Sequence, residues 1–288
     1  MAVATSSTPT GKELAGLFDE VHLIRSGAQF IVFGARERGS GRPVACKVPH
    51  YARAAWVHEL VLAQAALLQR LAGHPHVLSS FGTVTLPDGR PVLVLDRCAA
   101  TLAERYTGVR LPLPQALATG IKIAGALDAV HRAGWLHCDV RTANVLLDLT
   151  GEPVLGGFDE AVATDPRAPR FPRHTITAST APELLEDGLP LPASDVYGLA
   201  AALYELIAGQ PAFRQYDGES AATVIVRVLG GQVQPIVEAD VPFEVSDLLT
   251  WALSADAAKR PPTPAWFAEE LARLEARLGL PRTPVILG

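Results

Sequence analysis

Two groups of polar residues in this 288-residue sequence have types and spacing that suit chemistry. Asp139 and Asn144 stand five positions apart between two apolar runs, so a carboxylate and an amide lie close together in one short segment. Lys47 follows an apolar run, and a cation that projects from an apolar strand is suited to binding phosphate. The alternative for Lys47 is an ordinary solvated charge. The residues indicate phosphate chemistry if the fold brings them together.

The elements that would position these residues change character along the chain. Apolar residues recur at every second position over 21–48, which predicts strands, and residues 81–96 predict a hairpin. Helical spacing predicts helices over 54–73 and in several segments after Cys98. A strand-rich first third followed by a helical remainder predicts an α+β chain of two lobes.

Composition narrows the class of protein. Hydrophobic residues make up 49% of the sequence and charged residues 19%, which allows a packed core and argues against global disorder. The net charge of −5 gives no support for a nucleic-acid-binding surface. Cys46, Cys98 and Cys138 lack metal-ligand spacing, so we expect reduced thiols in a cytoplasmic protein. We expect neither a secretory signal at the start nor a membrane-spanning segment.

Five motifs, in a characteristic order, relate the chain to a known family. They are Val44-Ala45-Cys46-Lys47, the loop 137–144, Ala181-Pro182-Glu183, the segment 194–206 and the segment 256–261. From about Val21 to Leu278 the chain resembles the eukaryotic-type Ser/Thr protein kinases and their bacterial relatives. The resemblance implies a bilobal α+β fold, with a small antiparallel sheet and one helix in the N-lobe and a larger, mainly helical C-lobe.

The resemblance also divides the chain into expected parts. These are a flexible N-terminus at 1–12, the N-lobe at 13–97, the C-lobe at 98–278 and a C-terminal tail at 279–288. A hinge between the lobes is expected near Asp96-Arg97-Cys98, and Lys47 and Asp139 are expected to face one cleft.

Roles for individual residues follow from the same resemblance. Asp139 would accept the proton of the attacking hydroxyl, Asn144 would hold a metal ion, and Arg141 would meet the transferred phosphoryl group. Lys47 would hold the phosphates of ATP. The other implied nucleotide-binding residues are Gly27, Val32, Ala45, Asp96, Cys98 and Leu146, with Val32, Ala45 and Leu146 against the adenine ring. The alternatives are loop bracing for Asp139 and Asn144, and ordinary core packing for the apolar residues.

In the C-lobe, the resemblance implies two structural contacts. Asp195 would brace the loop that carries Asp139, and Arg260 would form a buried ion pair with Glu183.

Several positions depart from the family pattern. In the phosphate-covering loop only the middle glycine, Gly27, remains, and Phe30 would hinder the close approach of backbone N–H groups to phosphate. Gln64 replaces the family's Glu and can hydrogen-bond to Lys47 without adding charge. Cys138 replaces an Arg that grips a phosphorylated activation loop, so we expect no control by such phosphorylation.

The largest departure is Gly157, which stands where the family has an Asp that binds Mg²⁺. Loss of this ligand should impair phosphoryl transfer severely, because positioning and charge neutralisation supply most of its rate. Asp159 or Glu160 could take over the metal, and the alternative for both is a solvated loop acid. Returning an Asp to position 157 is expected to strengthen metal-dependent nucleotide binding.

Three functions are compatible with these observations. The favoured one is a pseudokinase, a kinase-shaped regulatory module that binds ATP weakly, with a doubtful role for Mg²⁺ or Mn²⁺, and acts on a protein partner. The second is an active but divergent Ser/Thr protein kinase that uses Asp159 or Glu160 for metal. A small-molecule phosphotransferase is disfavoured, because Glu183, Asp195 and Arg260 match the protein-kinase substrate-binding architecture. We expect that the protein does not bind nucleic acid and has no membrane segment.

Overall fold

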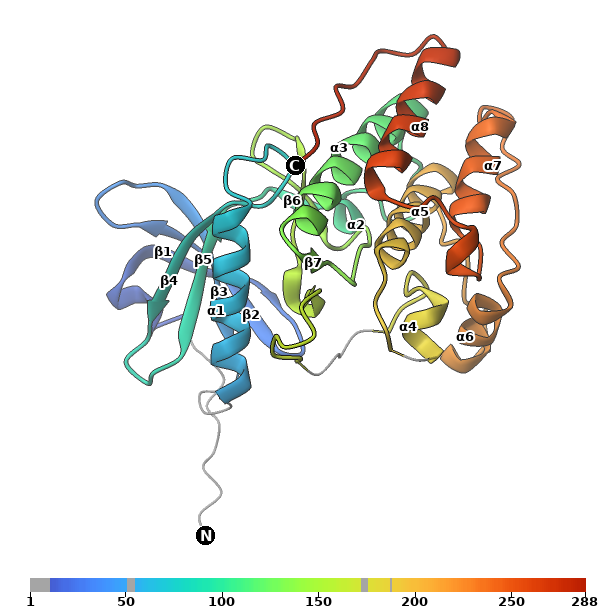
Figure 1. Cartoon of the computed structure of the whole chain (residues 1–288). Helices are drawn as coiled ribbons and strands as arrows, with labels where there is room; N and C mark the ends of the chain where they lie inside the picture. The colour runs from blue at the N-terminus through green and yellow to red at the C-terminus, as the bar shows by residue number, and fades with distance from the viewer. Residues whose placement is uncertain (1–10, 51–54, 172–175, 187) are drawn as a thin grey trace. The chain divides into compact units, whose positions relative to one another are not determined.

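The structure is a computed structural model, and it describes residues 11–50, 55–171, 176–186 and 188–288. The chain divides into two compact units. Unit 1 comprises Met1–Gly73 and Val77–Ala99, and unit 2 comprises His74–His76 and Ala100–Gly288. The predicted α+β class is confirmed, since unit 1 is built on an antiparallel sheet and unit 2 is mainly helical (Figure 1).

The sheet of unit 1 has the strand order β1-β2-β3-β5-β4, and each neighbouring pair is antiparallel. Its strands are β1 (Phe18–Ser26), β2 (Phe30–Glu37), β3 (Pro43–Pro49), β4 (Ser80–Thr85) and β5 (Pro91–Asp96). These strands coincide with the alternating apolar pattern, which places every second side chain on the same face.

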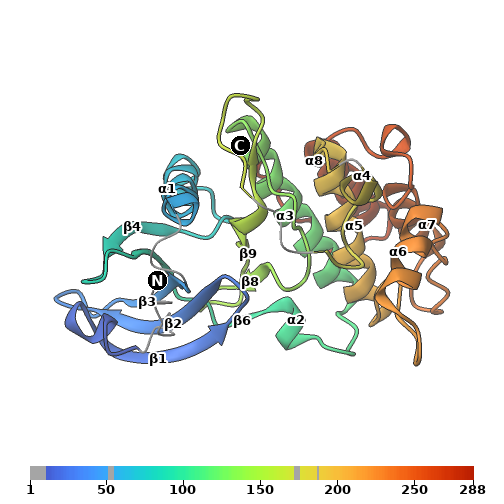
Figure 2. The ribbon, with the colours of Figure 1, turned by 90° about the horizontal axis from the view of Figure 1, so that it is seen from below.

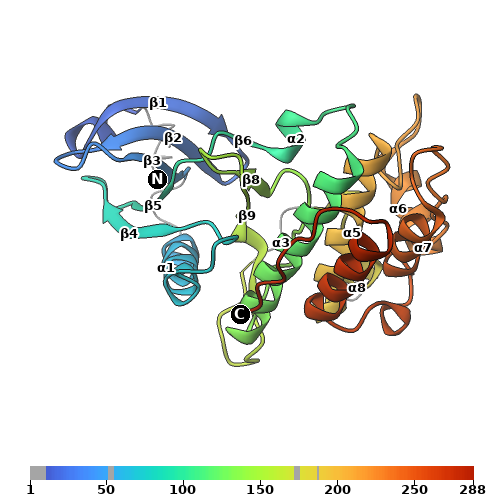
Figure 3. The same cartoon turned by 90° about the horizontal axis from the view of Figure 1, so that it is seen from above.

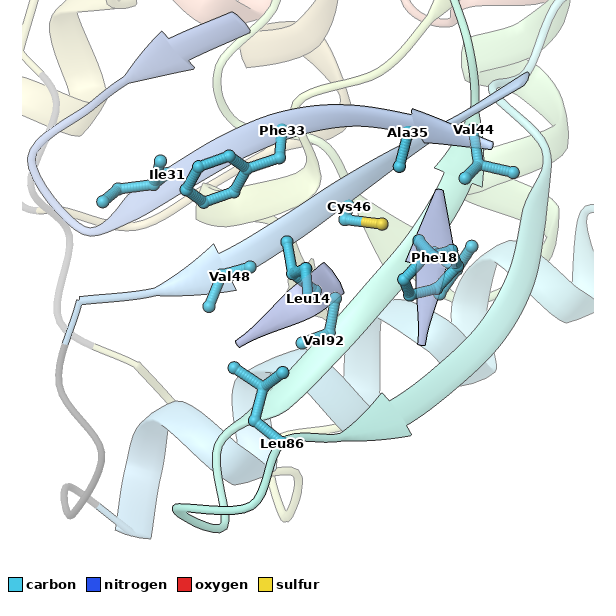
Figure 4. Packing of buried hydrophobic residues seen from close by; sticks show 11 residues of the cluster. Leu14, Phe18, Ile31, Phe33, Ala35, Val44, Cys46, Val48, Leu86 and Val92 are labelled. Atoms are coloured by element: carbon cyan, nitrogen blue, oxygen red, sulfur yellow. The ribbon is translucent and has the colours of Figure 1, made fainter. Parts of the chain in front are cut away.

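One face of this sheet carries the hydrophobic core of unit 1. Ile31, Phe33, Val44, Cys46 and Val48 all point to this face and are buried (Figure 4). Further members of the cluster are Leu14, Phe18, Ala35, Leu86, Val92 and Val94. Burial raises the pKa of the Cys46 thiol to about 12, so this thiol stays protonated and unreactive.

The segment that brings Leu14 onto the core is tied down by a buried arginine. Arg90 donates hydrogen bonds to Glu13 and Asp88, each at 2.6 Å, and its side chain is fully enclosed. The short 3-10 turn η1 (Leu14–Gly16) follows directly after Glu13. The ion pair therefore positions the start of the described chain against the sheet.

Helix α1 (Ala55–Arg70) packs beside β4 in unit 1 (Figure 2) and also contacts β5. It ends close to Gly73, whose φ of 98° is a left-handed conformation typical of the residue that follows a helix. This helix carries Gln64, which is buried.

Unit 2 is organised around helix α3 (Leu113–Arg132), which packs against α5 (Pro192–Ala208) and α8 (Pro264–Arg277). Its other α-helices are α2 (Leu102–Arg105), α4 (Pro182–Glu186), α6 (Ala221–Gly230) and α7 (Phe243–Ala252). After α8 the chain returns along α3, where the Gly288 N–H donates to Asp128 (Figure 3). None of the helices in the described ranges combines the length and apolarity that a membrane crossing requires.

Short strands and turns in unit 2 hold the loops between the helices. β6 (Ala100–Thr101), β8 (Val145–Leu147) and β9 (Pro153–Leu155) form one sheet, and β7 (Trp135–Leu136) pairs with β10 (Val162–Ala163). Two further 3-10 turns are η2 (Phe158–Glu160) and η3 (Ala257–Lys259). Because β7 and β8 flank residues 137–144, these strands fix both ends of the loop that carries Asp139.

Candidate active site in the loop of Asp139

As predicted, the side chain of Asp195 braces the loop 137–144 by binding backbone N–H groups at its start. Its carboxylate accepts hydrogen bonds from the N–H groups of His137 at 2.8 Å and Cys138 at 2.7 Å. Cys138 has a φ of 65°, a left-handed conformation that is uncommon outside glycine and costs free energy. The two bonds to one buried carboxylate stabilise this strained conformation.

His131, in the last turn of α3, is the third partner of Asp195, at 2.7 Å from Nε2 to Oδ2. Burial alone would raise the pKa of Asp195, but the hydrogen bond and charge of His131 and the bond from His137 hold it below its usual range. Asp195 is therefore a carboxylate that links a helix end to the loop.

Asp139 is held by a side chain at the other end of the same loop. Nδ2 of Asn144 donates to Oδ2 of Asp139 at 2.6 Å and to its backbone oxygen at 2.8 Å. Nε of Arg141 lies 3.5 Å from Oδ1 of Asp139. The three residues named as catalytic from the sequence are thus brought together in unit 2.

Burial controls the protonation of Asp139. It raises the pKa of this carboxyl to about 6, although Arg141 and the bond from Asn144 act in the opposite direction. The nearby charges of Glu160 and Asp159 raise the pKa further. A carboxylate with a pKa near neutrality can accept a proton from a hydroxyl group, which is the property that a general base requires.

His137 supports Asp139 from beneath the loop. It is fully buried, and burial lowers its pKa, so the ring is neutral. Its Nε2–H donates to the Gly156 oxygen at 2.8 Å, while Nδ1 accepts from the Asp139 N–H at 3.3 Å. The ring also packs on Phe158, with centroids 4.8 Å apart. His137 therefore joins the Asp139 loop to the segment that contains Gly157.

Gly157 has a φ of 71° and lies directly against Asn144. A Cβ atom built on Gly157 would lie 2.3 Å from both Cγ and Oδ1 of Asn144, far inside a normal contact. Asn144 therefore occupies the position that the Cβ atom of an Asp at 157 would need. The expectation that Gly157→Asp simply adds a metal ligand has to be revised, because the substitution must first displace Asn144 and strain the backbone.

Within the described residues, no three His, Cys, Asp or Glu side chains group closely enough to hold an ion. The predicted ligand pair Asn144 and Asp159 stays a prediction. For Glu160 the alternative of a solvated loop acid is wrong, because only 5% of the residue is exposed.

In unit 1, the predicted phosphate-binding Lys47 is buried and donates to Oε1 of Gln64 at 3.0 Å. This bond confirms that Gln64 can replace the family's Glu as a partner. Lys47 pairs with Val32 across β2 and β3, and Ala45 lies two residues before Lys47, so the three side chains share one face of the sheet. Gly27 is exposed in the turn before β2.

The remaining predicted nucleotide-binding residues are distributed over both units. Asp96 ends β5 and Cys98 is buried just after it in unit 1, whereas Leu146 lies on β8 in unit 2 and is partly buried. Their grouping with Lys47 around a nucleotide, and a common cleft for Lys47 and Asp139, stay predictions.

The predicted brace in unit 2 is confirmed. Arg260 donates to both carboxylate oxygens of Glu183, at 2.9 and 2.8 Å, and its side chain is completely buried. Burial would raise the pKa of Glu183, but the bonds from Arg260 and Ser194 lower it, so Glu183 is ionised at neutral pH.

Two contacts of the loop escaped the sequence analysis. One is the His131–Asp195 pair. The only sign of it in the sequence is that His131 stands six residues before His137, close to the loop. The other is the bond from Thr142 Oγ1 to Glu205 of α5, at 3.0 Å. Both join residues about 60 positions apart, and only packing of the helices brings them together.

An antiparallel sheet with a buried lysine, and a helical unit with an Asp139–Asn144 loop braced by Asp195, define a protein-kinase-like domain. The protein kinase domain family matches residues 18–271, and the chain belongs to this family.

Curated relatives agree with this assignment. The chain is 33% identical over 274 residues to the serine/threonine-protein kinase PknK of Mycobacterium tuberculosis, a match that covers 91% of this chain and 24% of PknK. It is 30% identical over 268 residues to the DNA damage-responsive serine/threonine-protein kinase RqkA of Deinococcus radiodurans, covering 90% of this chain and 39% of RqkA. It is also 36% identical over 200 residues to the serine/threonine-protein kinase PkaB of Streptomyces coelicolor, covering 65% and 46%. The chain thus spans about a quarter of PknK and less than half of the other two.

The contact between Gly157 and Asn144 makes a testable prediction about stability. Gly157→Ala should lower the free energy of unfolding by at least about 2 kcal/mol, through the left-handed backbone and the clash together. Gly151→Ala is the matched control, because Gly151 has a φ of 92° and open space around its Cβ position. This control should cost only about 1 kcal/mol. Equal losses in urea unfolding of the two variants would contradict the packing of Asn144 on Gly157.

Proposed function

We propose that this chain is a Ser/Thr-type protein kinase-like domain that acts as a pseudokinase, a regulatory module that binds ATP weakly and with little dependence on metal. One observation carries the proposal: position 157 has no carboxylate, and Asn144 lies where the Cβ atom of any side chain at this position would be. Phosphoryl transfer depends on metal ions that neutralise the phosphates. The lack of a carboxylate at position 157 therefore removes the metal ligand whose loss should reduce the rate most.

The proposal leaves nucleotide binding in place. Val32 and Ala45 lie on the Lys47 face of the sheet and offer apolar surface to an adenine ring. Leu146 of unit 2 is proposed to meet the opposite side of the ring. Without a bridging metal, the charge of the triphosphate stays largely uncompensated, which favours an affinity in the high-micromolar range or weaker.

The second candidate is an active, divergent Ser/Thr kinase. Asp139, Asn144 and Arg141 are assembled in one loop, and the charges of Asp159 and Glu160 reach Asp139 strongly enough to raise its pKa. One of these two acids would then bind the metal. The names of the relatives, which all describe serine/threonine-protein kinases, favour this candidate.

Transfer of labelled γ-phosphate to the chain itself and to generic protein substrates, with Mg²⁺ or Mn²⁺, separates the two candidates. A pseudokinase should show background transfer that Asp139→Asn leaves unchanged. Calorimetry should show that the Kd for ATP changes by less than about threefold between Mg²⁺ and EDTA. Robust transfer that is lost in Asp139→Asn and Asp159→Asn would reject the pseudokinase in favour of the active kinase.

The proposal includes the setting of the domain. Members of a protein kinase family act on proteins, and we propose a protein partner or substrate for this chain and a cytoplasmic location. The predicted parts 13–97, 98–278 and 279–288, and the hinge near Asp96-Arg97-Cys98, belong to the same proposal, whereas most of the N-terminal part predicted at 1–12 lies outside the described residues.

A further inference from the structure

Phe30 lies over the ammonium group of Lys47. In the β2–β3 pair, Val32 is directly opposite Lys47, and Phe30 precedes Val32 by two residues, so its side chain is on the Lys47 face. Nζ of Lys47 is 4.3 Å from the centroid of the Phe30 ring, well within cation–π distance. Both residues are 7% exposed. The ring therefore covers one side of the cation that the resemblance to protein kinases assigns to phosphate.

The turn before Phe30 is closed on itself. The Gly27 N–H donates to the Phe30 oxygen at 2.8 Å, so this backbone donor is already used inside the turn. His50, directly after β3, contacts the Gly27 oxygen through Nε2 at 2.8 Å and donates its N–H to the Gln29 oxygen at 2.9 Å. These bonds fix the turn to β3 and hold the first residue of β2, Phe30, in place.

We propose that Phe30 is a specificity-determining residue that caps Lys47 and removes the advantage of ATP over adenosine. The inference rests on the proposed function, in which the adenine ring binds on the face of Val32 and Ala45. Lys47 is only 7% exposed with the ring in place, so a phosphate group that takes the place of Phe30 at Nζ breaks the cation–π contact and exposes the ring to water. Adenosine needs no contact with Lys47. The domain therefore binds adenosine about as tightly as it binds ATP.

The test is calorimetric titration of the full chain with adenosine and with ATP, both in EDTA at the same ionic strength. For the unaltered protein the two Kd values should agree within about threefold. Phe30→Ala should tighten ATP binding by about tenfold and leave adenosine unchanged, since loss of the ring opens one side of the Lys47 ammonium to phosphate while its bond to Gln64 remains. Adding Lys47→Ala should abolish that gain. Phe81→Ala is the matched control, because it removes a cation–π contact with Arg42, at 3.8 Å, elsewhere in unit 1.

Two results would overturn the cap. One is an unaltered protein that binds ATP at least about tenfold more tightly than adenosine, and the other is a Phe30→Ala gain that survives Lys47→Ala. Phe30→Leu removes the ring and keeps a smaller apolar side chain, so it serves if Phe30→Ala fails to fold, with a smaller expected gain in ATP binding.

Labelling of Lys47 by an amine-reactive ester, read by mass spectrometry, tests the cap without any nucleotide. Labelling should be faster in Phe30→Ala or Phe30→Leu than in Phe81→Ala, and equal rates would reject the cap. If neither adenosine nor ATP binds, the proposed nucleotide binding fails, while the labelling rates still decide whether Phe30 covers Lys47.

Discussion

Arg260→Ala is expected to lower the free energy of unfolding by about 3–5 kcal/mol, the usual cost of removing one partner of a buried ion pair. The guanidinium makes a bidentate pair with Glu183 and also donates to the backbone oxygens of Ser254, Ala193 and Ala255, at 2.7, 3.0 and 3.0 Å. It packs on the Tyr197 ring as well, with Cζ 4.8 Å from the ring centroid. Alanine leaves the Glu183 carboxylate and these oxygens without that donor. Urea-induced unfolding followed by circular dichroism measures the loss.

Arg273→Ala is the control for this prediction. Arg273 pairs with Glu269 and Glu270 on α8, but its side chain is 58% exposed, and exposed pairs contribute at most about 1 kcal/mol. In the double variant Glu183→Ala with Arg260→Ala, the combined loss should be smaller than the sum of the single losses, since the pair is removed together. An unchanged melting temperature in Arg260→Ala would show that the brace contributes nothing to stability.

Asp139→Asn is expected to stabilise the metal-free protein at pH 7.5. The pKa of Asp139 is raised from 3.8 in the unfolded chain to about 6 in the folded one, so the folded state binds more protons between these values. Folding stability therefore falls as the pH rises from about 4 to about 6, and the penalty is complete above that window. At 1.36 kcal/mol per pKa unit, its upper limit is about 3 kcal/mol.

Asparagine carries no charge, so the gain from Asp139→Asn should be close to the full penalty at pH 7.5 and near zero at pH 4. Unfolding in urea with EDTA at the two pH values measures it. Asp148→Asn provides a contrast, because hydrogen bonds from Thr150 and Glu152 outweigh burial and lower the pKa of Asp148. That variant should lose stability at pH 7.5. An equal gain in Asp139→Asn at both pH values would show that packing, and not the buried charge, is the cause.

The loss of stability that the buried Asp139 carboxylate causes is relevant to function. Natural proteins keep a destabilising buried charge mainly where it serves activity or binding. If the pseudokinase proposal is right, Asp139 is a relic of the catalytic loop or serves its regulatory shape. If transfer is found, the same penalty is the cost of a general base with a pKa near neutrality.

The sequence by itself was enough to predict the class of fold and most of its elements. Alternating apolar residues over 21–48 and 81–96 predicted the strands of the sheet in unit 1, because a half-buried strand repeats every two residues. The motif residues predicted the contacts of Asp195 and of Glu183 with Arg260, and the structure confirms both. Such predictions succeed because local periodicity and the order of motifs depend only on the order of residues in the chain.

Only the tertiary structure shows which side chains lie against Gly157 and Lys47. The absence of an Asp at position 157 is visible in the sequence, but the packing of Asn144 into that space depends on a left-handed backbone that the sequence does not show. The burial of Glu160 and the position of the Phe30 ring over Lys47 were equally hidden. These features depend on side chains from different strands and turns meeting in space, and a burial or contact of that kind has no periodic signature along one chain.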